Sequence, residues 1–161
     1  MNWEKTKKLI GGRKGLLQQL EAACGGVEGI IWFHVASLGE FEEARPVIEA
    51  ARERYPQGKI LLTFFSPNGY EARKDWPVVD WVFYLPFDTR RNMRRFFDIV
   101  RPSKAIFTIG ELWPHIPERA RGTSASYPVA GDNVSGLRDE PCFPRCARGQ
   151  KREDRARERL S

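Results

Sequence analysis

The sequence predicts an α/β domain in which helices cover a parallel β-sheet. Two observations in the first 116 residues lead to this prediction. Short continuous apolar runs, the pattern of strands buried on both faces, recur along the chain. Stretches with apolar residues at helical spacing separate these runs. Because helices alternate with the strands, consecutive strands are expected to run parallel and to be joined by right-handed crossovers.

The predicted order is one helix followed by four strands that alternate with three helices. The first helix is expected from about residue 3 to residue 23, and Gly11, Gly12 and Gly15 weaken its middle, so it is either one helix or two pieces. The strands are expected at residues 29–36, 59–65, 81–85 and 104–109. The helices between them are expected at residues 40–55, 70–75 and 88–100.

Three local signals refine these boundaries. Pro46 either kinks the helix in which it lies or marks that helix's true first turn. Residues 66–69, Ser-Pro-Asn-Gly, form a turn sequence. Asp88 is placed to cap the last helix, which Arg101 and Pro102 close.

Composition excludes several classes of protein. The chain has 161 residues, of which 41% are hydrophobic and 30% charged, as in a soluble protein with one domain. We expect no transmembrane segment, because no apolar run reaches the length of a membrane span. We expect no signal peptide, because the first charged stretch is not followed by an apolar h-region and a small-residue cleavage site. Cys24, Cys142 and Cys146 are too few for a disulfide framework, which favours a reducing compartment, and we expect no metal site. The net charge of +6 favours an anionic partner.

The last 45 residues differ from the rest. Residues 117–161 are rich in Arg, Gly, Pro and Ser, and their few large apolar side chains follow neither the helical nor the strand period. Such a stretch cannot bury enough apolar surface to offset its ordering entropy. We therefore predict a domain at residues 1–116 and a mostly disordered tail at residues 117–161.

The expected sheet indicates where a ligand binds. In open parallel sheets, ligands bind beyond the carboxyl ends of the strands. Glycine there allows close approach of the backbone, and N–H groups at helix starts can receive an anion. Four loops follow the predicted strands, at residues 37–40, 66–69, 86–88 and 110–115.

Two glutamates in these loops each have two interpretations. Glu40 is either a general base toward a hydroxyl or a helix-start acid that complements the helix dipole. Glu111 is either a second active-site carboxylate or the cap of a following helix. His34 lies inside an apolar strand and is expected to be a core residue rather than a ligand, whereas the role of His115 stays open.

Basic side chains cluster on the last predicted helix. Its four arginines fall on one side and are either phosphate ligands or a solvated face: Arg90, Arg91, Arg94 and Arg95. The first strand is not followed by the Gly-x-Gly-x-x-Gly pattern of dinucleotide-binding proteins, and the chain has no P-loop sequence.

Three short elements occur in a specific combination. Residues 32–41 contain Ser-x-Gly-Glu, residues 66–69 are Ser-Pro-Asn-Gly, and residues 111–114 are Glu-Leu-Trp-Pro. At this spacing they resemble the N-terminal part of the 3-deoxy-D-manno-octulosonic acid (Kdo) transferases, which move Kdo from CMP-Kdo to lipid A. The resemblance covers about residues 10–115.

This resemblance implies the N-terminal half of a glycosyltransferase-B fold, in which two Rossmann-like domains face a cleft. The N-terminal domain receives the lipid A precursor and the C-terminal domain holds CMP-Kdo. Transfer inverts the anomeric centre and needs no metal or other cofactor. The catalytic base of the family maps to Glu40, and Glu111 is implied as a second functional carboxylate. The acceptor-binding residues implied are Ser37, Gly39, Ser66, Asn68, Gly69, Arg90, Arg91 and Arg94.

The resemblance also implies partners and a location. The partners are the lipid A precursor, CMP-Kdo and the inner-membrane surface, with no nucleic acid. The expected location is peripheral, at the cytoplasmic face of the bacterial inner membrane. The N-terminal helix, with Leu9 and Ile10 among lysines, either lies on an anionic surface or simply covers the sheet.

The chain departs from the family after Pro114. The family continues there with the rest of this domain and then a second one, which residues 117–161 do not resemble. The simplest account is a frameshifted or truncated gene, and a fused disordered tail is the alternative. We expect that the chain by itself does not transfer Kdo, because the donor-binding half is absent. The family also often has Glu and Asn where this chain has Ile109 and His115.

Two other functions stay open. A basic Rossmann-like module could bind nucleic acid or another polyanion, with an affinity that falls steeply as salt rises. Only Phe96 and Phe97 are interleaved with the arginines, and both are expected to face the core. The other alternative is a non-catalytic fragment.

Overall fold

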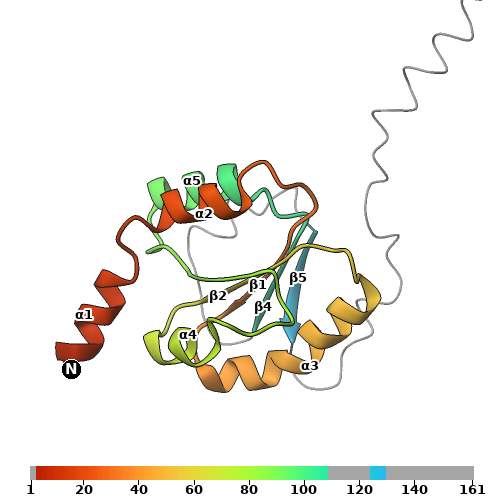
Figure 1. The fold of residues 1–161 in the computed structure, drawn as a ribbon, viewed down its shortest axis with the longest axis horizontal. Helices are drawn as coiled ribbons and strands as arrows, with labels where there is room; N and C mark the ends of the chain where they lie inside the picture. Colours follow the sequence, from red (N-terminus) through yellow and green to blue (C-terminus); the bar gives the residue numbers. More distant parts are fainter. Residues whose placement is uncertain (1–2, 109–123, 130–161) are drawn as a thin grey trace, which may run out of the picture.

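The computed structural model describes residues 3–108 and 124–129 of the chain. Five parallel strands form one sheet in the order β3-β2-β1-β4-β5 (Figure 1). The strands are β1 (Ile31–Val35), β2 (Ile60–Phe64), β3 (Trp81–Tyr84), β4 (Lys104–Thr108) and β5 (Ser124–Val129). The predicted α/β fold with a parallel sheet is confirmed.

Helices cover both faces of the sheet. They are α1 (Trp3–Gly11), α2 (Leu16–Cys24), α3 (Leu38–Arg54), α4 (Pro67–Arg73) and α5 (Arg90–Val100). In Figure 1, α2 and α5 lie together on one face, α3 and α4 lie on the other, and α1 projects to one side. This arrangement has three layers, helix on sheet on helix.

The core is divided by the sheet into two apolar clusters. Trp32 of β1 packs with Leu20 of α2 and Phe96 of α5 on one face. Ile31 and Phe33, two residues apart on β1, pack with α3 on the other face. Strand β1 therefore has both faces buried, which is why its sequence is continuously apolar rather than alternating.

The predicted N-terminal helix consists of two helices, α1 and α2, which is one of the two alternatives that its glycines suggest. Gly15 has a φ of 69°, a left-handed conformation that glycine adopts at little cost, and α2 begins directly after it. Gly12 packs against the ring of Tyr84 so closely that a Cβ atom at position 12 would overlap that ring.

Three helix starts differ from the sequence-based expectations. Helix α3 begins at Leu38 and continues past Pro46, so Pro46 does not mark its first turn. The predicted turn at 66–69 opens α4, with Ser66 at the N-cap and Pro67 in the first turn, where the missing N–H costs no hydrogen bond. Thr89, not Asp88, caps α5: its hydroxyl accepts a hydrogen bond from the backbone of Asn92 over 3.2 Å.

Strand β5 lies within residues 117–161, a segment in which the sequence predicts no strand. The strand pairs in parallel with β4 at the end of the sheet, and the register shifts between Ile106 and Thr108. An edge position tolerates Pro128, whose nitrogen has no hydrogen to donate. The other residues of 117–161 lie outside the described residues, and the boundary at 116 stays a prediction.

Within the described part of the chain, none of the helices combines the length and the apolar composition needed to cross a bilayer.

Candidate active site

The strand order creates a topological switch point at β1, where the connections to the two neighbouring strands lie on opposite faces of the sheet. From β1 the chain passes through α3 to β2 on one side, whereas β4 lies on the other side of β1. Helices α3 and α5 lie on opposite faces of the sheet (Figure 1). At such a topological switch point a crevice opens beyond the carboxyl ends of the strands. The residues that follow β1, from Ala36 to Glu40, lie at this point.

Glu40 occupies the first turn of α3 and turns back toward the end of β1. Its Oε2 atom accepts a hydrogen bond of 2.7 Å from the backbone nitrogen of Ala36. Ser37 is the N-cap of α3, and its hydroxyl accepts a bond of 3.3 Å from the nitrogen of Glu40. This reciprocal pattern resembles a capping box and fixes the orientation of a half-buried carboxylate. The helix-start interpretation of Glu40 therefore describes its local contacts, and these contacts are compatible with a role as a base.

The loop after β2 lies directly beside this carboxylate. The nitrogen of Ser66 donates a 2.8 Å hydrogen bond to the carbonyl oxygen of Ala36, the residue whose own N–H binds Glu40. Gly69 is buried, and a Cβ atom there would lie 2.5 Å from the ring of Phe64 and 3.2 Å from the nitrogen of Leu38. Packing between the two loops therefore explains the glycine at position 69.

Arg13 was not singled out from the sequence, yet it joins three segments at this edge. Its guanidinium donates hydrogen bonds to the carbonyl oxygens of Leu9, Phe65 and Leu85 over 2.9, 2.9 and 2.7 Å. The rings of Phe65, Tyr84 and Phe87 lie 4.7–4.9 Å from its Cζ atom. Burial lowers the pKa of Arg13 to about 10. Arg13 thus holds the connection between α1 and α2 against the ends of β2 and β3.

Below the edge, a buried polar network crosses from β1 to β2. Thr63 Oγ1 accepts a 2.8 Å hydrogen bond from Trp32 Nε1 and lies 2.9 Å from His34 Nδ1. Burial lowers the pKa of His34 to about 3, so its imidazole is neutral at physiological pH. The expectation that His34 is a core residue is confirmed.

The structure gathers some of the expected site residues and separates others. Ser37, Gly39 and Glu40 lie at the start of α3, beside Ser66 at the start of α4, and Asn68 is exposed in the first turn of α4. The arginines lie on α5, on the opposite face of the sheet from α3, and are exposed: Arg90, Arg91 and Arg94. Phe96 and Phe97 pack on Trp32, as expected, and so offer no stacking surface for bases. Glu111 lies outside the described residues.

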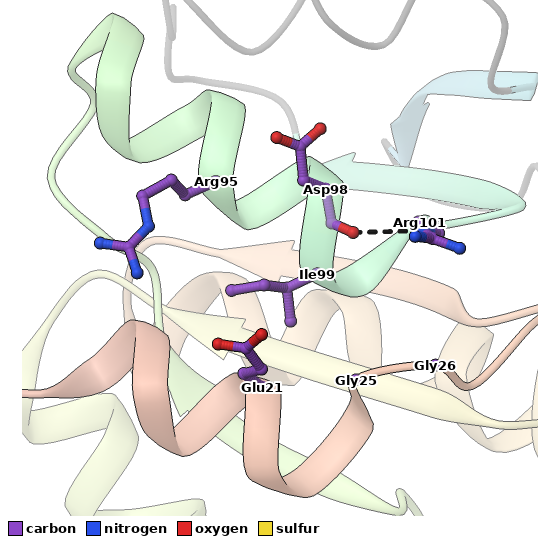
Figure 2. Close-up of a pocket in the computed structure, with 7 residues that line it drawn as sticks. All are labelled: Glu21, Gly25, Gly26, Arg95, Asp98, Ile99 and Arg101. Carbon is purple, nitrogen blue, oxygen red and sulfur yellow. Dashed lines mark hydrogen bonds between the residues drawn. The ribbon is translucent and has the colours of Figure 1, made fainter.

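One pocket lies away from these loops. It lies between the end of α2 and the end of α5 (Figure 2). Its volume is about 510 Å³. Glu21 and Arg95 approach it from the two helices, beside Asp98 and Arg101. Because α2 and α5 lead into the amino ends of β1 and β4, this pocket is not part of the candidate site.

Comparison with known proteins decides the family. Residues 8–130 match the sequence pattern of a family described as 3-deoxy-D-manno-octulosonic-acid transferase (kdotransferase). The chain belongs to the Kdo transferase family. The match extends beyond the predicted domain boundary at residue 116 and includes β5.

The chain is similar in sequence to several proteins that are named Kdo transferases. The protein of Haemophilus influenzae is 37% identical over 97 residues, which are 59% of this chain and 22% of the relative. That of Aquifex aeolicus is 32% identical over 90 residues, 55% of this chain and 25% of the relative. That of Chlamydia pneumoniae is 29% identical over 133 residues, 81% of this chain and 30% of the relative. The chain thus spans about a fifth to three tenths of these Kdo transferases, which are glycosyltransferases.

Proposed function

We propose that this chain forms the acceptor-side part of an enzyme that transfers Kdo from CMP-Kdo to a lipid A precursor. The observation that carries the proposal is the carboxylate of Glu40, fixed by the N–H of Ala36 at the switch point of a parallel sheet. Membership of the Kdo transferase family supports the reaction class. The two Rossmann-like halves of a glycosyltransferase-B fold, and a site at the cytoplasmic face of the inner membrane, belong to the same proposal.

In the proposed mechanism Glu40 acts as the general base. It removes the proton from an acceptor sugar hydroxyl as the hydroxyl oxygen attacks the anomeric carbon of Kdo. The bond from that carbon to CMP breaks, CMP leaves with the bonding electrons, and the configuration inverts. A base needs a fixed direction more than it needs mobility, and the bond from Ala36 supplies that direction. Glu111 is proposed as a second carboxylate of the site.

The loops beside Glu40 are proposed to hold the acceptor. Ser37, Gly39, Ser66 and Asn68 lie in or next to the first turns of α3 and α4, where small side chains leave room for a sugar. At Gly39 a Cβ atom would meet only the hydroxyl of Ser37, at 3.8 Å, which indicates open space. Gly69 contributes by letting the two loops approach each other.

The test compares Glu40→Gln with Glu43→Gln, which makes the same chemical change at an exposed position of the same helix. Both are placed in a chimera in which this chain replaces the matching segment of the Haemophilus influenzae relative, and Kdo transfer to a lipid A precursor is measured. Glutamine keeps an oxygen that can accept from Ala36, so the loop is expected to stay intact. We expect kcat to fall about 10²–10⁴-fold for Glu40→Gln, with KM nearly unchanged. A kcat within a few-fold of the unsubstituted chimera rejects Glu40 as the base.

A further inference from the structure

A cleft lies at the same edge of the sheet as Glu40, between the connection from α1 to α2 and helix α4. Its volume is about 450 Å³. Its lining includes Lys7, Lys8 and Lys14 together with Tyr70 and Tyr84, whose rings are stacked with centroids 4.1 Å apart. None of the residues assigned above as base or acceptor contacts lines it.

The charge of this lysine cleft is largely uncompensated. Among the described residues, Lys8 and Lys14 form no ion pair, and Lys7 lies over the ring of Trp3 at 5.3 Å. The one acid in the lining, Glu71, is paired with Lys74 over 3.0 Å. Three ammonium groups around a partly enclosed volume raise the local potential, which favours a compact anion.

The cleft is held in shape before any ligand arrives. Consecutive turns run through the connection, with hydrogen bonds from Gly12 to Lys8 and from Lys14 to Gly11 over 3.0 and 3.1 Å. Arg13, which lies between these residues, is bonded to the ends of β2 and β3. The backbone that carries Lys14 is therefore fixed, and less ordering entropy opposes binding.

We propose that the lysine cleft binds a phosphate monoester group carried by a sugar. The lysines neutralise the phosphate, while Gln19 and the phenol groups at Tyr70 and Tyr84 offer hydrogen-bond partners and ring surface to the sugar. Burial raises the pKa of both tyrosines, so both remain hydrogen-bond donors at neutral pH. The proposal deepens the proposed function and rests on it in one respect, because the lysine cleft and Glu40 lie at the same edge of the sheet.

The ligand chemistry has two sources, a soluble sugar phosphate and a phosphorylated lipid headgroup. The 161-residue chain is titrated with glucosamine 1-phosphate, and binding is followed by amide chemical shifts. Unphosphorylated glucosamine, which differs only in lacking the phosphate, is the comparison. In a second arm, vesicles that contain phosphatidic acid are compared with vesicles of equal charge that contain phosphatidylglycerol, which has no monoester. Saturable binding in either arm supports the cleft, and the arm that binds identifies the source.

Two double variants carry the same charge change. Lys8→Gln with Lys14→Gln alters the cleft, and Arg45→Gln with Arg54→Gln alters exposed positions of α3 that do not line it. We expect the dissociation constant to rise at least tenfold for the lysine pair and to change less than twofold for the arginine pair. Shifts should concentrate at Gly11, Gly12 and Gln19. Equal weakening by both pairs, or absence of saturable binding in both arms, overturns the proposal. The titrations contain no CMP-Kdo, so their failure leaves the Glu40 test unaffected.

Discussion

Arg13 donates a hydrogen bond from Nε to the carbonyl oxygen of Leu85, a residue 72 positions further along the chain. The same guanidinium reaches Phe65, so one side chain from the N-terminal connection holds the ends of two adjacent strands. Arginine suits this position because its planar group donates in several directions while its faces stack on aromatic rings.

Replacing Arg13 by Gln is expected to destabilise the fold by about 2–4 kcal/mol, because it leaves partly buried carbonyl oxygens without their donor and removes the ring contacts. Arg13→Lys should recover only a minor part, since three different guanidinium nitrogens reach the three carbonyls and a single ammonium nitrogen cannot occupy all three places. Urea unfolding measures both. Lys14→Gln, the exposed neighbour, is the control and should shift the free energy of unfolding by less than about 0.5 kcal/mol.

The buried His34 is expected to lower the free energy of unfolding in mild acid. Burial lowers its pKa in the folded protein from 6.5 to about 3, outweighing its bond to the backbone of Thr63, and the charge of Arg13 lowers it further. Between these two pH values the unfolded chain binds a proton that the folded protein does not. Stability should therefore decrease as pH falls below 6.5, by up to about 1.4 kcal/mol per pH unit. Urea unfolding at pH 7, 6 and 5 tests the slope. The imidazole proton shifts of His34 should stay constant over that range, and a midpoint near 6.5 would contradict the argument.

Asp80 adds a separate dependence at lower pH. Burial alone would raise the pKa of Asp80, but hydrogen bonds from the Ile60 nitrogen, Arg52 and Lys59 together lower it below its ordinary value of 3.8. The stabilisation is therefore complete above about pH 4 and is lost as pH falls through the lowered pKa. Asp80→Asn should cost stability at pH 7, and its deficit relative to the unsubstituted protein should shrink below pH 4. A deficit that is constant from pH 7 to pH 3 would show that the charge of Asp80 is irrelevant.

The two glycines near Glu40 should respond in opposite ways to alanine. Gly69→Ala places a methyl group 2.5 Å from the ring of Phe64, which a packed core accommodates only by shifting, at a cost of about 1–3 kcal/mol. Gly39→Ala enters open space within the first turn of α3 and should be neutral or stabilise by up to about 1 kcal/mol. Thermal unfolding of the two variants under identical conditions makes the comparison. Equal destabilisation would mean that the close approach at position 69 does not explain its glycine.

Much of the fold follows from local patterns. The strands β1 and β2 are continuous apolar runs, and their flanking helices have clear apolar stripes, so order and direction were predictable. Glu40 was identified because it follows a buried strand. Strand β5 has no such run, since its sequence, Ser-Ala-Ser-Tyr-Pro-Val, contains a proline and small polar residues. Its place depends on pairing with β4, which is information that local sequence does not carry.

The contacts that shape the site could not be predicted from the sequence, because they too depend on segments that meet only in the folded chain. Arg13 binds backbone carbonyl oxygens, which every residue type provides. The residue types at positions 65 and 85 therefore do not predict that Arg13 binds there. The role of Gly69 likewise arises from the approach of two loops that the sheet brings together. The sequence predicts only that Lys7, Lys8 and Lys14 belong to the N-terminal helical stretch, because the cleft also needs Tyr70 and Glu71 of α4 in its lining.

The position of Ala36 offers an experimental advantage. Its N–H is bonded to the Glu40 carboxylate and its carbonyl oxygen to the nitrogen of Ser66. A single ¹⁵N-labelled amide thus works as a built-in probe: its resonance should follow the ionisation of one side chain and the arrival of any molecule that disturbs it. Spectroscopy on the isolated chain can in this way observe the proposed base directly, without waiting for turnover.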